Sequence, residues 1–149
     1  MSINDWYEIE IVDPEYLSGK SCRRLFNHLL QSKREHKVRW VELDELIGAV
    51  DNALDNEAIY PLDKAFFEQL VKVIQFDWGD FYFLTKPQSV LEFESYPERI
   101  RNCAFMVRCV DDTYWFVYLR TDAEKDQLLE LYPNAKVQRG ELEDFIYMW

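Results

Sequence analysis

Residues 103–120, CAFMVRCVDDTYWFVYLR, decide the fold of this chain. The two halves, Cys103–Val110 and Thr113–Arg120, are rich in β-branched and aromatic residues, which favour strands. Only Asp111 and Asp112 separate the halves, and two residues are the length of a tight hairpin turn. The stretch therefore predicts an antiparallel hairpin.

The register of this hairpin follows from a two-residue turn. Such a turn sets Val107 opposite Phe116 and Arg108 opposite Trp115. Apolar residues then occupy both faces, which is typical of strands in the interior of a sheet.

Upstream of the hairpin, residues 13–76 are expected to be rich in helix. Apolar residues recur there with helical spacing in three segments. The first begins with Ser21 as its N-cap, the second spans 43–54, and the third follows Pro61 and runs as far as Ile74.

Strands are expected before and after this helix-rich region. Trp6–Val12 alternates weakly between polar and apolar residues, which indicates a short strand. The chain is expected to break at 77–80 and to become strand-rich over 80–120, with strands at Phe81–Leu84 and Val90–Glu94 before the hairpin.

The C-terminal part is predicted to be mainly helical. Thr121 and Glu124 have the spacing of a capping box, so a helix is expected to start there and to end at Leu131, before a proline. A short strand is expected at 135–138, and helical spacing recurs over 142–149.

Length and composition favour one folded domain over residues 1–149. The chain has a net charge of -11, but 48% hydrophobic residues supply enough apolar surface for a core. Its four glycines and five prolines form no linker. We therefore predict a single α+β domain with helices packed on one face of a mainly antiparallel sheet, the hairpin at 103–120 being central.

A cytoplasmic location is expected. The N-terminus lacks the basic and apolar regions of a signal peptide, and the longest apolar run, Tyr114–Leu119, is too short to span a membrane. Three cysteines, an odd number without framework spacing, favour reduced thiols.

Charge is divided unevenly along the chain. Residues 20–39 hold seven Lys and Arg and one Glu, a net of +6, whereas residues 40–63 hold seven Asp and Glu and no base, a net of -7. Two interpretations remain open. Either adjacent elements neutralise each other, or the surface is bipolar and its acidic part meets a basic partner.

The residues that usually carry chemistry have spacings typical of structural roles. Cys22, His28 and His36 lie six and eight positions apart, unlike the ligands of structural zinc sites. Cys103 and Cys109 lie an even number apart and are expected on one strand face, in the core. We therefore expect no bound metal, no cofactor and no catalytic residue, since phosphate-binding and nucleophile motifs are also missing from the sequence.

The leading hypothesis is a non-enzymatic protein-binding domain for a basic protein partner, with an immunity or inhibitor role as its most concrete version. An acidic surface of this kind imitates nucleic acid, and the same charge disfavours direct nucleic-acid binding. The expected contacts are carboxylates on the outer side of the predicted helix at 43–54, with a tryptophan as anchor. These residues are Glu42, Glu45, Asp51, Asp55, and Trp40 or Trp78.

Two alternatives stay open. One is a small metal-dependent hydrolase or nuclease that uses carboxylates of the 77–94 region, among them Asp80, Glu92 and Glu94, although the lysine that accompanies such carboxylates is missing from that strand. The other is a subunit that assembles with itself and buries its surplus aromatic residues.

Overall fold

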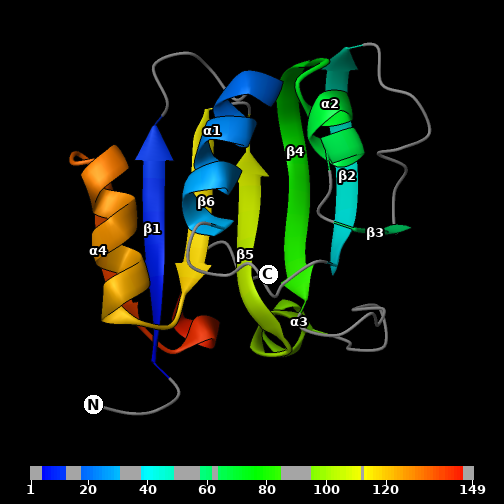
Figure 1. The fold of residues 1–149 in the computed structure, drawn as a ribbon. Coiled ribbons are helices and arrows are strands. Elements are labelled where there is room, and N and C mark those ends of the chain that lie inside the picture. The colour runs from blue at the N-terminus through cyan, green and yellow to red at the C-terminus, as the bar shows by residue number, and fades with distance from the viewer. Residues whose placement is uncertain are drawn as a thin grey trace.

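Within the residues that the computed structural model describes, seven strands form one sheet in the order β3-β2-β4-β5-β6-β1-β7 (Figure 1). Each pairing between neighbouring strands is antiparallel. The described residues are 5–12, 18–30, 38–48, 58–61, 64–84, 95–111 and 113–145. The strands are β1 Trp6–Val12, β2 Val38–Gly48, β3 Ala58–Pro61, β4 Val73–Leu84, β5 Cys103–Val110, β6 Tyr114–Leu119 and β7 Lys136–Gly140.

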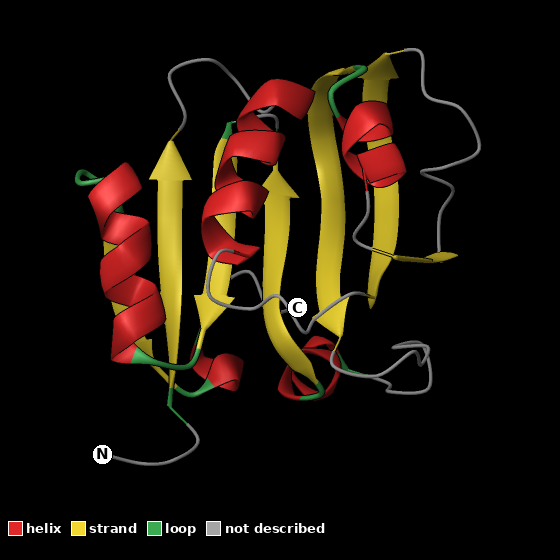
Figure 2. Cartoon of the chain, in the orientation of Figure 1, coloured by secondary structure: helices red, strands yellow, loops and turns green. Residues whose placement is uncertain are grey.

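Three helices lie on one face of the sheet, as Figure 2 shows. They are α1 Gly19–Leu30, α2 Lys64–Leu70 and α4 Asp122–Leu131. The short α3, Tyr96–Arg101, lies at one end of the sheet (Figure 1), and a 3-10 turn follows β7 at Leu142–Asp144. The predicted α+β class, with helices on one face of an antiparallel sheet and a central hairpin, is confirmed.

The hairpin has the predicted strands but a different register. Arg108 pairs with Phe116 instead of Trp115, and Val107 pairs with Val117 instead of Phe116. The reason is the turn: Val110 pairs with Tyr114, so three residues connect the strands instead of two.

The turn itself holds an unusual backbone conformation. Asp111 has φ 51°, in the left-handed region that Asp tolerates better than most residues. The N–H of Thr113 donates to the carbonyl of Val110 at 3.2 Å, and its hydroxyl donates to the carbonyl of Asp111 at 2.8 Å. These two bonds close the turn.

The helix predicted over 43–54 is wrong as far as Gly48, because β2 is a strand that pairs with β4 along its whole length. The register shifts at Leu43/Glu45, Glu45/Leu46 and Ile47/Gly48. Each shift interrupts the alternation of a regular strand, so the apolar residues of this segment no longer follow a period of two. Residues 49–54 lie outside the described part of the chain.

The third predicted helix is too long. α2 ends at Leu70, and Val73 already opens β4. The break predicted at 77–80 is also wrong, since β4 continues through it to Leu84. Because β2, β3 and the start of β4 fall within 13–76, the described part of that region is not predominantly helical.

Local capping signals identify the helices more reliably. α1 begins before the predicted Ser21, because Ser18 and Ser21 each donate a backbone N–H to the other's hydroxyl, at 2.9 and 3.2 Å. In α4 the predicted capping box is confirmed: the N–H of Glu124 donates to the hydroxyl of Thr121 at 3.2 Å. The α4 helix ends at Leu131, as expected.

Apolar side chains form one cluster on each face of the sheet. The larger cluster joins α1, α2 and α4 to the sheet, and Phe26 of α1 sits edge-on against Phe81 and Phe83 of β4. The second cluster includes Ile100 of α3 and Phe145 after the 3-10 turn. Both faces of the central strands are therefore covered.

The cysteines are free and buried, but two of them are not on one face as expected. Cys109 belongs to the first cluster and Cys103 to the second. The register shift between Phe83 and Leu84 brings Cys103 opposite Leu84, so β5 is irregular at its start. Burial raises the pKa of the Cys103 thiol to about 12.

The predicted strands at the two ends of the chain are present. β1 spans Trp6–Val12 as predicted. β7 spans Lys136–Gly140, so it ends two residues after the strand predicted at 135–138. Of the helix expected at 142–149, the described part is a 3-10 turn, and 146–149 lie outside it. The strand expected at 90–94 also lies outside the described residues. In the part of the chain that is described, no helix has the length and apolar character needed to cross a membrane.

The hairpin gives the first prediction. Phe116 is 2% exposed, so Phe116→Ala should lower the free energy of unfolding by about 3–5 kcal/mol in urea melts. Asp111→Ala should lower the free energy of unfolding by only about 1–2 kcal/mol. Alanine is strained in the left-handed backbone conformation of this position, but the change removes no buried side chain. Asp111→Gly, which relieves that conformation, is the control and should cost less than Asp111→Ala. Equal losses for Phe116→Ala and Asp111→Ala would contradict the observed turn.

Candidate functional site

Strand pairing brings together four of the six predicted contact residues. In β2, three of them lie directly opposite residues of β4: Trp40 opposite Tyr82, Glu42 opposite Asp80 and Glu45 opposite Trp78. Directly opposite residues of an antiparallel pair share one face of the sheet. We call these four residues, Trp40, Glu42, Glu45 and Trp78, the tryptophan-acid face.

The predicted helical context of these residues is wrong, because Glu42 and Glu45 lie in strand β2. Asp51 and Asp55 lie outside the described residues. Strand pairing, and not helical spacing, therefore places positions 42 and 45 opposite Asp80 and Trp78.

Trp78 of β4 is a large aromatic residue with 41% of its surface exposed to solvent. The next two residues of β4, Gly79 and Asp80, are buried. A tryptophan so exposed on the face of a packed sheet offers a large apolar contact area to a partner.

Beside this face lies a buried ion pair between Asp80 and Arg108, each 7% exposed. The two residues lie directly opposite each other in β4 and β5. Arg108 donates from Nε to Oδ1 of Asp80 at 2.6 Å and from a terminal nitrogen to Oδ2 at 3.1 Å. Tyr82 also donates to Oδ2, at 3.1 Å, and the guanidinium lies 4.3 Å from the ring centre of Tyr96.

The surroundings of this pair favour the charged form of Arg108. Burial alone would lower the pKa of Arg108, but the Asp80 carboxylate more than offsets it and raises that pKa overall. Both carboxylate oxygens of Asp80 accept hydrogen bonds from the protein. The ion pair therefore links β4 to β5 inside the sheet.

A second buried carboxyl lies on β1. Glu8, which is opposite Tyr118 of β6, accepts a hydrogen bond from that tyrosine's hydroxyl at 2.8 Å. Burial raises the pKa of Glu8, and the bond from Tyr118 offsets this only in part. Burial, and then the charge of Glu8, raise the pKa of Tyr118. The sequence interpretation missed this pair, although an acid between Tyr7 and Ile9 in a predicted strand was a signal of it.

The residues considered for metal binding do not form a cluster. In the described chain, no group of three or more His, Cys, Asp or Glu side chains is arranged to hold a metal ion. Cys22 is buried in the core, and His28 faces the carbonyl of Gln127 through its Nε2 atom. Of the alternative carboxylates, Asp80 is paired as described above, and Glu92 and Glu94 lie outside the described residues.

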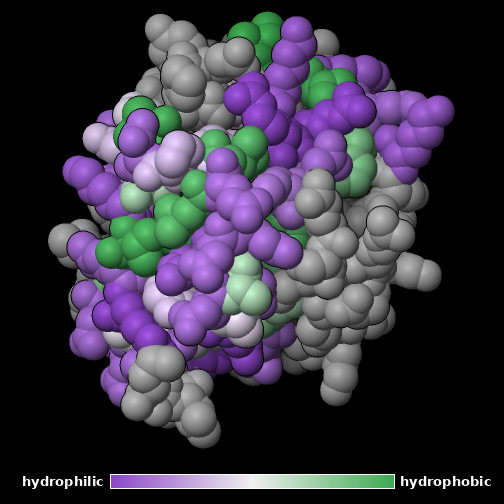
Figure 3. Space-filling view, turned by 60° about the vertical axis from the view of Figure 1, so that its left-hand side comes forward, coloured by the Kyte–Doolittle hydropathy of each residue, from purple (hydrophilic) through white to green (hydrophobic). Residues whose placement is uncertain are grey.

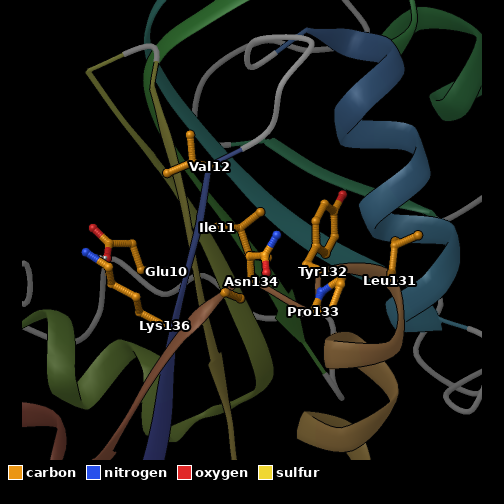
Figure 4. A pocket seen from close by; sticks show the side chains of 9 residues that line it. Glu10, Ile11, Val12, Leu131, Tyr132, Pro133, Asn134 and Lys136 are labelled. Carbon is orange, nitrogen blue, oxygen red and sulfur yellow. Dashed lines mark ion pairs between the residues drawn. The ribbon is translucent and has the colours of Figure 1, made fainter.

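The described residues also line a depression on α1 and a cavity near the end of β1. A shallow depression of about 450 Å³ is lined by Lys20, Arg23, Arg24 and Asn27 of α1 and by Val71. A deeper cavity of about 240 Å³ lies between the end of β1 and the end of α4. Figure 4 shows Ile11, Tyr132 and Asn134 on one side of the β1 ribbon, with Glu10 and Lys136 together on the other.

The buried ion pair gives a second prediction. Asp80→Asn should lower the free energy of unfolding by about 3–5 kcal/mol, because it leaves the Arg108 charge buried without its counter-ion. Glu143→Gln, which breaks the exposed pair with Arg101, is the matched control and should cost at most about 1 kcal/mol. Urea melts measure both. If the two variants lose the same stability, the Asp80 pair is not the buried clamp described here.

Glu8 gives a third prediction, on pH. Its folded-state pKa is raised, so the folded protein holds the proton more tightly than the unfolded chain does. Stability from this group is present at low pH and is lost as pH rises through the folded pKa. Relative to Glu8→Gln, the wild type should therefore lose stability in urea melts as pH rises above about 4, the ordinary pKa of a glutamic acid. A difference that stays constant above that pH would exclude this linkage.

Comparison of the chain with protein-family models, curated proteins and solved structures gives no match. A function for these surfaces is therefore proposed from their geometry.

Proposed function

We propose that this protein is a non-enzymatic binding domain whose partner is a basic protein, and that the tryptophan-acid face is the contact surface. An immunity or inhibitor role, in which the domain covers a basic functional surface of its partner, is the most concrete form of this proposal. The observation that carries it is the exposed Trp78 directly opposite Glu45.

Trp78 has the properties of an interface anchor. Tryptophan is enriched among the residues that contribute most to protein–protein binding, usually near the centre of the contact. The residue is 41% exposed on a strand that pairs with β2 on one side and β5 on the other, so its ring can be covered without unfolding the domain.

The charge around Trp78 sets the sign of the partner. Glu42 and Glu45 belong to residues 40–63, which hold seven acids and no base. The neighbouring Asp80 adds little to this negative field, since Arg108 neutralises it. A local excess of acidic residues in the strand paired with an aromatic anchor favours a basic partner, mainly through a faster and more selective encounter.

The pairing of Asp80 separates this proposal from the hydrolase or nuclease alternative. A catalytic metal ion would need carboxylate oxygens that are open to it. The Asp80 oxygens instead accept three hydrogen bonds from Arg108 and Tyr82. This arrangement favours binding over catalysis for the described part of the 77–94 region.

The test is capture of partners from a lysate of the source organism, followed by binding kinetics with the retained protein. We expect a basic protein to bind, and Trp78→Ala to weaken its affinity by at least tenfold, about 1.4 kcal/mol. Glu42→Lys/Glu45→Lys should lower the association rate more than it raises the dissociation rate, and the effect should shrink as salt rises.

The matched control is Glu130→Lys/Glu141→Lys, which changes the net charge equally at two exposed positions outside this face. It should leave the affinity nearly unchanged. If both pairs of reversals weaken binding alike, only net charge matters and the proposed face is wrong. A partner that is acidic, or one indifferent to Trp78→Ala, would also contradict the proposal.

A further inference from the structure

We propose a second binding site, at the opposite end of the sheet, where β7 and the adjoining cavity take an extended segment of another protein. The segment would pair with β7 as an added strand and insert one apolar side chain into the cavity, with acidic residues on either side of it. This site is independent of the tryptophan-acid face.

The first observation is the open edge of the sheet. β7 is the last strand in the sheet order and pairs only with β1 among the described strands. Four of its five residues are exposed and the fifth, Gly140, is half-buried. The outward backbone N–H and C=O groups of such a strand are a template for pairing with another chain.

The second observation is the position of the cavity. The last pair between β1 and β7 is Glu10 with Lys136, so β1 continues past the start of β7 through Ile11 and Val12. The cavity lies at this step, between the β1 end and the residues Leu131–Ala135. Figure 4 shows Ile11, Leu131 and Tyr132 around it.

The size and lining of the cavity fit a side chain better than a free ligand. Its volume is about 240 Å³, below the roughly 300–1,000 Å³ of pockets that hold small molecules. Its walls are mainly apolar, from Ile11, Val12, Leu131 and Pro133. A cavity beside an open strand edge is the arrangement by which added strands gain side-chain specificity.

Exposed apolar residues lie near this edge on both faces of the sheet. Val12, which pairs with Tyr114, is 61% exposed and lines the cavity, and Val137, which pairs with Ile9 on the other face, is 38% exposed on β7. Figure 3, which turns the side of α4 and β1 toward the viewer, shows hydrophobic residues in a band among hydrophilic ones. An added strand would cover apolar surface that the domain leaves open.

The charge of the edge indicates acidic neighbours for the inserted side chain. β7 carries Lys136 and Arg139 and no acid, in a chain of net charge -11. Lys136 is 84% exposed in its side chain, and its Nζ lies 3.9 Å from Glu10, a loose pair. Arg139 lies 3.6 Å from Asp5. Lys136 is thus available to carboxylates of an incoming strand at little cost, whereas Arg139 also donates to the Tyr7 hydroxyl at 3.4 Å and lies over the Tyr7 ring.

Charges on an edge strand also have a protective role, since they discourage pairing between copies of a protein. That role alone predicts no binding at all. The cavity beside the edge is what favours a ligand, because protection against aggregation does not require one.

The test is selection of random eight-residue peptides on the folded protein, followed by affinity measurements with the enriched peptides. We expect an apolar residue flanked by Asp or Glu. Ala135→Trp, which fills the cavity, and Lys136→Glu/Arg139→Glu should each weaken binding at least tenfold. Lys20→Glu/Arg23→Glu, the same charge change on α1, should not. Amide hydrogen exchange should slow in β7 when peptide binds.

Several results would overturn the proposal: no enrichment, enriched peptides that bind all variants equally, or a footprint of slowed exchange outside β7. A dimer that Lys136→Glu/Arg139→Glu dissociates would assign the edge to a second copy and reject a peptide. If urea melts show that Ala135→Trp is unfolded, the exposed Val12→Glu replaces it. Loss of this site would leave the binding of a basic partner through Trp78 unaffected, so the two proposals fail separately.

Discussion

Burial of the central strands on both faces is the constraint on which the rest of the structure depends. In β5 and β6, all but Ala104 and Tyr114 are buried, and those two are half-buried. A buried charged or hydroxyl group on these strands is destabilising unless it has a partner inside the sheet. Arg108 finds Asp80, and Tyr118 finds Glu8. The two faces of β5 and β6 are therefore filled by the core, and the surfaces open to a partner lie on other strands, β4 and β7.

The elements that were predicted correctly are those determined by interactions between residues close together in the sequence. The strands Cys103–Val110 and Trp6–Val12 follow from composition and alternation, and the start of α4 follows from the hydroxyl of Thr121 and its spacing to Glu124. These signals lie within a few residues of one another, so no tertiary information is needed to interpret them.

What failed depends on partners distant in sequence. The helix predicted over 43–54 rests on a spacing that matches α-helix, but pairing with β4 outweighs that local preference. The register of the hairpin failed for a different reason, because a positive φ at Asp111 permits a longer turn than the sequence suggests. Propensity and spacing do not report where a sheet absorbs an extra residue.

The candidate site was predictable only as a set of residue types. The sequence indicated the acidic residues at 40–63 and a tryptophan anchor as separate features. That Glu45 lies opposite Trp78 follows only from the pairing of β2 with β4. The Asp80–Arg108 pair had a signal that went unused: a single arginine within the apolar stretch 103–110 requires a buried counter-ion. A charged residue in a predicted central strand is therefore evidence for a partner on a neighbouring strand.

The order of the strands also determines how the two proposed surfaces affect each other. Trp78 lies on β4 and the basic edge is β7, with β5, β6 and β1 between them. Four strand spacings amount to about 19 Å. This exceeds the Debye length of about 8 Å at physiological ionic strength, so charge at one surface is largely screened from the other. A net charge of -11 therefore does not determine what either end binds. A basic partner at one end and an acidic segment at the other can be held at the same time, each recognised by its local field.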